Sequence, residues 1–383
     1  MSTTKHKSRH SGPVVTMSWN TQLDLRTRVD VGSGARRRLP AILSQIGAGR
    51  RVLVLSQPFI PGHWFSDLTG ALTSDHYQVS TREVPDGEAC KSTDSLLRSW
   101  DALQARGFER KDTIVALGGG AVSDLAGFVA ATYLRGLNLI LIPTTLLAQV
   151  DAAIGGKTGI NLPSGKNLAG TFYFPKAVLV DTEILSTLPA KHFASGLAEM
   201  IKYALIEETV ASSTEYGMGP RLLLDVLEKN LNSSFAYDHP ALSGLITSCI
   251  KMKLSVVAKD PYESGLRRCL NVGHTLGHAI ETVSDFRLTH GEAISIGMAF
   301  ALRLAVKKKR LDASSLSRIE ALLSKVGLPL DIPKDLAKTK LVDAMAHDKK
   351  RQGEKIKFVL PDARLGAVDY QVDLPLTDLA SLL

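Results

Sequence analysis

The sequence between residues 29 and 181 alternates short apolar runs with longer amphipathic stretches, and this alternation limits the possible folds most strongly. Four runs are almost entirely Val, Ile, Leu and Ala, and they lie at residues 51–55, 113–117, 139–142 and 177–180. Short apolar runs bounded by Gly, Pro, Asp or Ser are typical of strands buried in a parallel sheet. Helical spacing in residues 92–106 and 122–134 then predicts βαβ units with helices on both faces of that sheet.

After residue 188 the strand-like runs fade and helical patterns dominate. These patterns cover residues 194–207, 222–231, 242–258, 269–282, 292–304 and 313–326. Only residues 355–360 and the segment near Val368 look like strands again, which predicts one hairpin. We therefore expect a Rossmann-like α/β nucleotide-binding domain over residues 25–188 and a mainly α-helical domain over residues 189–383.

Composition and charge restrict the function. The chain of 383 residues is 44% hydrophobic and 22% charged, a balance that excludes a disordered or collagen-like chain. Its formal net charge of +8 requires an anionic partner, which is nucleic acid, an acidic membrane or a small anionic substrate. Residues 1–24 are rich in Ser, Thr and basic side chains, and Asp24 is the first acidic residue. We expect a flexible basic tail there in preference to a transit peptide.

Cysteine content and apolar run length bear on the compartment. The three cysteines form no CxxC pair and their number is odd, which favours a reducing, cytoplasmic environment. The most apolar run, residues 137–150, contains Asn138, Pro143 and Gln149 and is too short and too polar to cross a bilayer. We therefore expect a cytoplasmic protein with no membrane partner.

A glycine triplet is the first candidate site. Gly118, Gly119 and Gly120 directly follow a predicted strand and precede a helix whose first turn holds Ser123 and Asp124. Such a turn lets a phosphate approach the backbone, and the helix N-terminus supplies free N–H donors. The GxGxxG pattern fails because Ser123 stands where the last glycine belongs. By itself the triplet fits a tight structural turn as well as a pyrophosphate site.

The second candidate is a group of histidines. Three of the ten histidines, His274, His278 and His290, fall within seventeen residues. His274 and His278 are four apart and share one face of a predicted helix, which is a metal-ligand spacing. A protease zinc helix would need Glu directly after the first histidine, where Thr275 stands. A metal site and a pair of hydrogen-bonded helix histidines therefore remain equally good interpretations.

A third group consists of cations and an amide beside small polar residues: Arg135, Lys157, Lys166, Asn167, Lys202, Lys253, Arg267, Lys349 and Lys350. Lys157 and Lys166 belong to a Gly-rich stretch that follows a buried strand, a placement that suits holding a phosphate or carboxylate. Glu199 and Lys202 are three apart on a predicted helix, so their charges point the same way. An isolated pair of this kind is most often a surface salt bridge.

Taken together, these motifs closely resemble the 3-dehydroquinate synthase family of the shikimate pathway. The resemblance extends from about Val29 to Val368. It rests on VPDGEACK (84–91), ALGGGAVSDLAGFVAATYLRG (116–136), PTTLLAQVDAAIGGKTGIN (143–161), GKNLAGTFYFPKAVLVDTEIL (165–185), GLAEMIKYALI (196–206), LRRCLNVGHTLGHAIE (266–281), HGEAISIGM (290–298) and DKK (348–350). The resemblance implies an enzyme that uses NAD and a divalent metal, zinc or cobalt. Its implied substrate is the sugar phosphate DAHP, converted to 3-dehydroquinate and phosphate.

The resemblance also assigns roles to residues of this chain. The family's metal ligands map onto Glu199, His274 and His290, so His278 lies near the substrate. Its cofactor contacts map onto Asp86, Gly87, Glu88, Lys91, Gly119, Gly120, Ala121, Val122, Ser123, Asp124, Thr144, Thr145, Lys157 and Lys166. Its phosphate contacts map onto Asn167, Lys202, His278, Lys349 or Lys350, and Arg135 of a neighbouring subunit. Its contacts to the carboxylate and ring hydroxyls map onto Lys157, Lys253, Arg267 and Asn271, with Asp151 among the polar groups.

In this family, NAD transiently oxidises a hydroxyl, phosphate is eliminated, the hydride returns, and an intramolecular aldol reaction closes the ring. A catalytic homodimer is expected from the role of Arg135. Ser56, Gln57 and Pro58 depart from the family, because an Asp or a Thr-Asn pair is expected there. The alternatives are aminodehydroquinate synthase or another sugar phosphate cyclase, and then a metal-dependent polyol dehydrogenase. A nucleic-acid binder is disfavoured because aromatic residues make up only 6% of the chain.

Overall fold

A six-stranded parallel sheet forms the first half of the protein. The computed structural model describes residues 26–163, 165–217, 222–231, 237, 241–346, 351–352 and 355–383. The predicted tail at residues 1–24 lies outside the described residues. The strand order is β1-β8-β5-β4-β2-β3, with all pairs parallel. The strands are β1 (Arg28–Gly32), β2 (Arg51–Ser56), β3 (Gln78–Glu83), β4 (Thr113–Gly118), β5 (Asn138–Pro143) and β8 (Ala177–Asp181).

The four strands predicted from apolar runs are all present, and each boundary is met within one residue. Their side chains are almost completely buried on both faces of the sheet. The edge strands β1 and β3 were not predicted. Their side chains are only partly buried, so they lack the continuous apolar run that marks a central strand.

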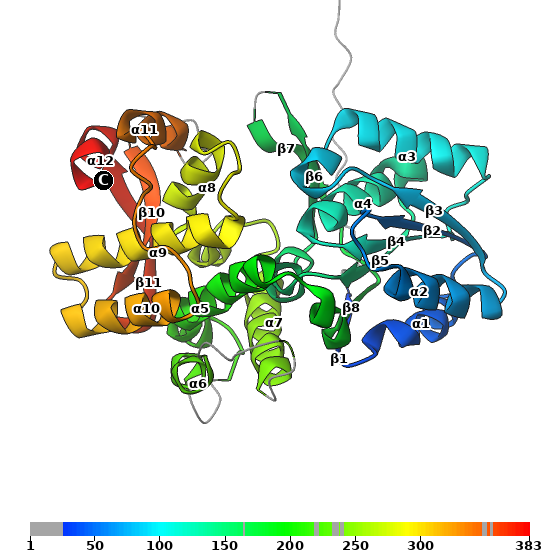
Figure 1. The fold of residues 1–383 in the computed structure, drawn as a ribbon, viewed down its shortest axis with the longest axis horizontal. Coiled ribbons are helices and arrows are strands. Elements are labelled where there is room, and N and C mark those ends of the chain that lie inside the picture. The colour runs from blue at the N-terminus through cyan, green and yellow to red at the C-terminus, as the bar shows by residue number, and fades with distance from the viewer. Residues whose placement is uncertain are drawn as a thin grey trace, which may run out of the picture.

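Helices cover both faces of this sheet, as the alternation of the sequence predicts (Figure 1). On one face, α1 (Leu39–Gln45) and α2 (Gly62–Ser74) pack against a core that includes Val52 and Val54. On the other face, α3 (Thr93–Ala105) and α4 (Gly120–Thr132) pack against a core that includes Leu53 and Leu55. Alternate residues of β2 thus face opposite helical layers, because successive side chains of a strand point to opposite faces.

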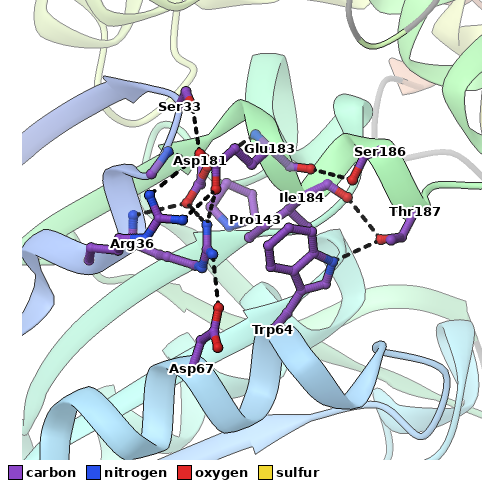
Figure 2. Close-up of polar contacts among 12 residues, drawn as sticks. Ser33, Arg36, Trp64, Asp67, Pro143, Asp181, Glu183, Ile184, Ser186 and Thr187 are labelled. Atoms are coloured by element: carbon purple, nitrogen blue, oxygen red, sulfur yellow. Dashed lines mark hydrogen bonds and ion pairs between the residues drawn. The ribbon is translucent and has the colours of Figure 1, made fainter.

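A charged cluster around buried Arg36 attaches the turn after β1 to the end of β8 (Figure 2). Arg36, whose side chain is 2% exposed, donates to Asp181 Oδ2 at 2.6 Å and to Glu183 Oε2 at 2.9 Å. The Asp181 carboxylate is fully buried and also accepts the backbone N–H of Gly34 at 2.9 Å. The Arg36 guanidinium lies 4.4 Å from the ring centroid of Trp64 on α2. One arginine therefore joins β8, α2 and the turn after β1.

The Gly-rich stretch after β5 folds into structure that the sequence did not predict. Residues Ala148–Ala152 form a single π-helical turn, and β6 (Lys157–Leu162) and β7 (Gly165–Phe172) form an antiparallel hairpin. The hairpin packs on α4 so closely that a Cβ at Gly127 would lie 2.3 Å from Thr158. The Thr158 side chain therefore occupies the space that a Cβ at Gly127 would need, which favours glycine there.

The second half of the chain is mainly helical. Its helices are α5 (Ala190–Ser213), α6 (Leu223–Asn230), α7 (Leu242–Lys259), α8 (His274–Val283), α9 (His290–Lys307), α10 (Ala313–Lys325), α11 (Lys338–Ala346) and α12 (Leu376–Leu382). The predicted hairpin is present as β10 (Lys355–Asp362) and β11 (Arg364–Pro375), with a short third strand, β9 (Arg351–Gln352). Within the described residues, no helix combines the length and apolar character that a membrane crossing requires.

The prediction of one continuous helix over residues 269–282 is wrong. A short 3-10 helix (Leu266–Asn271) comes first, and α8 begins only at His274. Gly273 between them has a φ of +77°, a left-handed conformation that breaks the helix. The break places His274 in the first turn of a new helix.

Candidate active site and metal centre

Three side chains from three helices converge into a candidate metal centre. Glu199 lies within α5, whereas His274 and His290 are the first residues of α8 and α9. Glu199 Oε1 lies 3.6 Å from His274 Nε2 and 3.4 Å from His290 Nε2. One ligand atom of each residue lies within 4.8 Å of the others. The predicted ligand set is therefore brought together, and His278 does not belong to this group.

The donor atoms are oriented as a cation site requires. Glu199 is fully buried; its Oε2 pairs with Lys202, and its Oε1 faces the Nε2 atoms of both histidines. Val272 carbonyl oxygen lies 3.1 Å from His274 Nδ1, and Glu281 Oε2 lies 3.3 Å from His290 Nδ1. Hydrogen bonds at Nδ1 fix the tautomer that leaves the Nε2 lone pair available to a metal. The residues present fit a divalent ion held by one carboxylate and two imidazoles.

The charge of this cluster also favours a cation. Burial alone would lower the pKa of His290, but the Glu281 and Glu199 carboxylates raise it to about 10. Without a metal, the site therefore takes up a proton between two acidic groups. A divalent ion would replace that proton, because metal ligands must be deprotonated.

Two glycines let α9 approach the other ligand helices. A Cβ at Gly291 would lie 2.3 Å from Ser195 Cα on α5, and a Cβ at Gly297 would lie 1.9 Å from the Gly273 carbonyl oxygen. Thr289 and Glu292 form a capping box at the start of α9. The motif HGEAISIGM therefore combines one ligand, His290, with the glycines that bring its helix into place.

Replacing Gly297 with alanine is expected to lower the free energy of unfolding by about 1–3 kcal/mol, because the added methyl group overlaps the backbone next to His274. It should also weaken metal binding, since α8 and α9 move apart. Urea unfolding and metal titration would measure both effects. Gly244→Ala on α7 is the matched control, because a Cβ there meets no atom within 4 Å. Equal stability of the two variants would contradict the prediction.

A series of alternating charges connects the candidate metal centre to a second cluster of polar side chains around Asp151. Lys202 forms an ion pair with Glu199 and lies 3.6 Å from Asp151 Oδ2. Lys253 donates to Asp151 Oδ1 at 2.5 Å, and the Tyr203 hydroxyl donates to the same oxygen at 2.8 Å. Burial alone would raise the pKa of Asp151, but the two lysines hold it well below its usual range. The surface salt bridge interpretation of Glu199 and Lys202 is therefore wrong, because Lys202 is also buried.

Next to this series of charges, a loop after α7 holds a second set of polar groups. Arg267 donates to the carbonyl oxygens of Gly155 at 2.9 Å and Pro261 at 2.6 Å. Glu263, which has a φ of +59°, forms an ion pair with Lys157 and accepts from Asn271 Nδ2 at 2.7 Å. The β6–β7 hairpin and the helical half of the protein therefore meet at predicted substrate residues.

The predicted cofactor residues lie at the carboxyl edge of the parallel sheet. The glycine turn follows β4, Thr144 and Thr145 follow β5, and the loop with Asp86 follows β3. Strands β3 and β4 lie on opposite sides of β2, so the strand order reverses there. Ligands of open α/β sheets bind at such a reversal. The prediction that the turn joins a strand to a helix is confirmed, since β4 ends at Gly118 and α4 begins at Gly120.

Lys91 connects this edge with the hairpin. Its buried ammonium lies 2.7 Å from Asp124 Oδ2 and also donates to Asn167 Oδ1. Burial alone would lower the pKa of Lys91, but Asp124 and Glu88 raise it. Gln57, in the segment that departs from the family pattern, donates to the Gly87 carbonyl oxygen at 3.5 Å. It therefore contacts the backbone of the same edge.

Comparison with known proteins shows the family to which the chain belongs. The family model described as 3-dehydroquinate synthase N-terminal matches residues 81–195, and the one described as 3-dehydroquinate synthase C-terminal matches residues 196–351. The chain belongs to the 3-dehydroquinate synthase family. A 3-dehydroquinate synthase of Picosynechococcus is 38% identical over 356 residues, which cover 90% of this chain and 94% of the relative.

Solved structures of related cyclases share the fold of this chain over nearly its whole length. A 2-deoxy-scyllo-inosose synthase, complexed with carbaglucose-6-phosphate, NAD⁺ and Co²⁺, has a TM-score of 0.80 at 27% identity and covers 93% of this chain and 95% of its own. A 2-epi-5-epi-valiolone synthase of Streptomyces hygroscopicus, with NAD⁺ and Zn²⁺ bound, has a TM-score of 0.82 at 25% identity and covers 96% and 98%.

Two predicted site residues, Lys349 and Lys350, lie outside the described residues, and a third, Arg135, lies apart from the cluster. Arg135 is exposed and follows the C-terminal end of α4, which is 13 residues long. Such a helix spans about 20 Å, so Arg135 lies far from the glycine turn. Among the described residues, Arg135 forms no ion pair with the other candidates, whereas exposed His278 lies beside His274, with ring centroids 5.3 Å apart.

The sequence analysis missed three polar residues of the candidate site: Tyr203, Glu263 and Glu281. Tyr203 was hidden in an apolar helical stretch, and no short motif marks Glu263, which reaches the site only through its backbone conformation. Glu281 could have been found, because it lies seven residues after His274 and three after His278 on α8. Positions with these spacings share one face of a helix.

Proposed function

We propose that this chain is a 3-dehydroquinate synthase, which converts DAHP to 3-dehydroquinate and inorganic phosphate. One observation carries the proposal: the Glu199, His274 and His290 cluster is continuous with a buried set of substrate-type cations. Lys202 pairs directly with Glu199, and Asp151 connects Lys253 to Lys202. A substrate with both a phosphate and a carboxylate matches a site that concentrates cations in this way.

We infer that Glu199, His274 and His290 hold zinc or cobalt and that the carboxyl edge of the sheet holds NAD. Held there, the divalent ion would supply Lewis-acid polarisation of a substrate hydroxyl, and NAD would supply reversible hydride transfer at the same carbon. The chain itself keeps donors and acceptors fixed around the reacting carbons, and it excludes water from the buried Glu199 and Lys202.

The chain's own groups then hold the two anionic ends of the substrate. Asn167, Lys202 and His278, with Lys349 or Lys350, are proposed to bind the phosphate. Lys157, Lys253, Arg267 and Asn271 are proposed to bind the carboxylate and the ring hydroxyls. Glu263, which bridges Lys157 and Asn271, would keep both in place when the substrate is absent.

The assembly follows from the position of Arg135. Since Arg135 lies at the end of α4 remote from the glycine turn, we propose that it serves the phosphate site of a second copy, which makes the enzyme a homodimer. We also propose two domains, residues 25–188 and 189–383, with the chemistry between them, and a cytoplasmic location. Size-exclusion chromatography with light scattering tests the dimer.

The alternatives make different demands on the site. Cyclases that act on sugar phosphates without a carboxylate do not need a cation at the position of Arg267, which is only 2% exposed here. A polyol dehydrogenase needs no phosphate-binding cations and releases NADH. Aminodehydroquinate synthase keeps the carboxylate and is distinguished by its amino substrate.

The deciding experiment is a phosphate-release assay on the purified, metal-loaded protein with NAD. We expect phosphate release from DAHP, formation of 3-dehydroquinate and no net NADH. Faster turnover of the amino analogue would favour aminodehydroquinate synthase, and NADH accumulation with glycerol-like alcohols would favour the dehydrogenase. No phosphate release from any sugar phosphate would reject the proposal.

The affinity for DAHP should fall as pH rises from 7 to 9. Burial lowers the pKa of Lys253 to about 8, although Asp151 opposes this effect. The ammonium that we propose for the substrate carboxylate is therefore mostly charged at pH 7 and mostly neutral at pH 9, so KM should rise about ten-fold. Lys253→Met should have a high KM with no rise over this range. A wild-type KM that stays constant would contradict the prediction.

A further inference from the structure

Glu281 is a buried carboxylate to which the proposed reaction assigns no role. It lies on α8 and is 6% exposed. Its Oε2 lies 3.3 Å from His290 Nδ1, the ring nitrogen opposite the proposed metal-binding atom. A carboxylate in this position fixes the rotation and the tautomer of an imidazole ligand and raises its basicity.

The second oxygen of Glu281 reaches the other half of the protein. Lys166 on β7, a predicted cofactor contact, donates to Glu281 Oε1 at 3.5 Å. Lys166 Nζ also lies 3.6 Å from Glu88 Oε1, in the cofactor loop after β3, and 4.4 Å from the ring centroid of Phe286. One carboxylate therefore contacts a metal ligand through one oxygen and a cofactor-side cation through the other.

These two contacts have a thermodynamic consequence. An ion bound by His290 holds that imidazole, and with it Glu281, in one orientation. Lys166 is then held where the cofactor needs it, so binding at either site reduces the ordering cost at the other. Coupling between two ligands is reciprocal by linkage.

We propose that Glu281 is a positioning residue, which orients His290 for the metal and connects it to Lys166, so that metal and NAD strengthen each other's binding. The proposal rests on the proposed function for the identity of the two ligands. It does not require turnover, because it concerns binding equilibria. His278 could join Glu281 and His290 around a second ion, since their ligand atoms also lie within 4.8 Å of one another. The structure favours the positioning role, because Glu281 already contacts His290 through Nδ1, which leaves Nε2 directed toward Glu199.

The test is to measure Zn²⁺ affinity by chelator competition, with and without saturating NAD, in wild type, Glu281→Gln and Lys166→Met. In wild type, NAD should tighten zinc binding about five-fold or more. Without NAD, Glu281→Gln should bind zinc about 10–100-fold more weakly, which is the usual effect of losing the hydrogen-bond partner of a metal-binding histidine. Lys166→Met should keep wild-type zinc affinity without NAD but lose the gain from NAD.

Glu320→Gln is the matched control, since the Glu320 side chain pairs with Arg303 at 2.7 Å, away from the ligand helices' N-termini. The Co²⁺ absorption spectrum of Glu281→Gln should change, and thermal unfolding of the metal-free proteins would identify a variant that fails to fold. Three results would each overturn the proposal. Glu281→Gln could bind zinc as tightly as wild type, NAD could tighten zinc binding in both variants as much as in wild type, or the wild-type chain could bind two zinc ions. Failure of the DAHP assay with normal zinc and NAD binding would reject only the proposed function.

Discussion

Replacing His274 with alanine is expected to remove the metal and to lower DAHP turnover at least about 1,000-fold. His274 supplies one of the three candidate ligand atoms, beside those of Glu199 and His290. Two ligands do not hold a catalytic ion firmly, and a metal that polarises a reacting oxygen contributes several kcal/mol to the reaction, roughly a factor of 1,000 or more in rate. Metal analysis of the purified variant and phosphate release would measure the two losses.

NAD should still bind after the same substitution, only about five-fold more weakly because the proposed coupling to the metal is lost. The glycine turn itself lies on β4 and α4, whereas His274 lies on α8. Cofactor titration by fluorescence would test this. His278→Ala is the matched control, since His278 is four residues away on the same helix and lies outside the Glu199 group. It should keep its metal while binding DAHP more weakly. A His274→Ala variant that is active and retains metal would refute the ligand assignment.

Replacing Arg36 with methionine is expected to lower the free energy of unfolding by about 3–5 kcal/mol, the cost of removing one partner of a buried ion pair. Asp181, which is fully buried, would lose its closest cation, and its charge would be held only by the backbone N–H groups that it accepts from. Methionine fills much of the same volume, so the effect would report the lost charge. Guanidinium-induced unfolding of the metal-free protein would measure it.

Arg37→Met is the control for this second experiment. Arg37 also pairs with Glu183, at 3.0 Å, but its side chain is 63% exposed. An exposed ion pair contributes about 0–1 kcal/mol, so this variant should resemble wild type. Equal destabilisation by the two substitutions would contradict a special role for the buried cluster in Figure 2. Arg36 lies away from the metal ligands, so the folded fraction of Arg36→Met should keep its metal.

Much of the fold could be predicted because its central strands are buried on both faces. Strands β2, β4, β5 and β8 must be apolar along their whole length, and that requirement is visible in a single sequence. Edge strand β3 has only one neighbour and partly exposed side chains, so its sequence looks like that of a loop. The helix break before His274 depends on the left-handed backbone at Gly273, which the spacing of apolar residues does not reveal.

The candidate site divides in the same way. The glycine turn and the three histidines stand out as motifs because their chemistry restricts the residue type. Glu263 and Tyr203 do not, because a glutamate and a tyrosine occur in many surroundings and their partners, Lys157 and Asp151, are distant in sequence. Their roles depend on contacts between segments 52 and 106 residues apart.

The sequence by itself determined the kind of fold, the family and the types of ligand, because buried strands, glycine turns and metal ligands each need particular residues. Only the tertiary structure decided how these parts are connected. It buried Glu199 with Lys202, a spacing that in isolation fits a surface salt bridge, and it placed Glu281 between His290 and Lys166. The physical reason is that burial, charge pairing and orientation depend on which distant segments pack together, and local pattern does not record this.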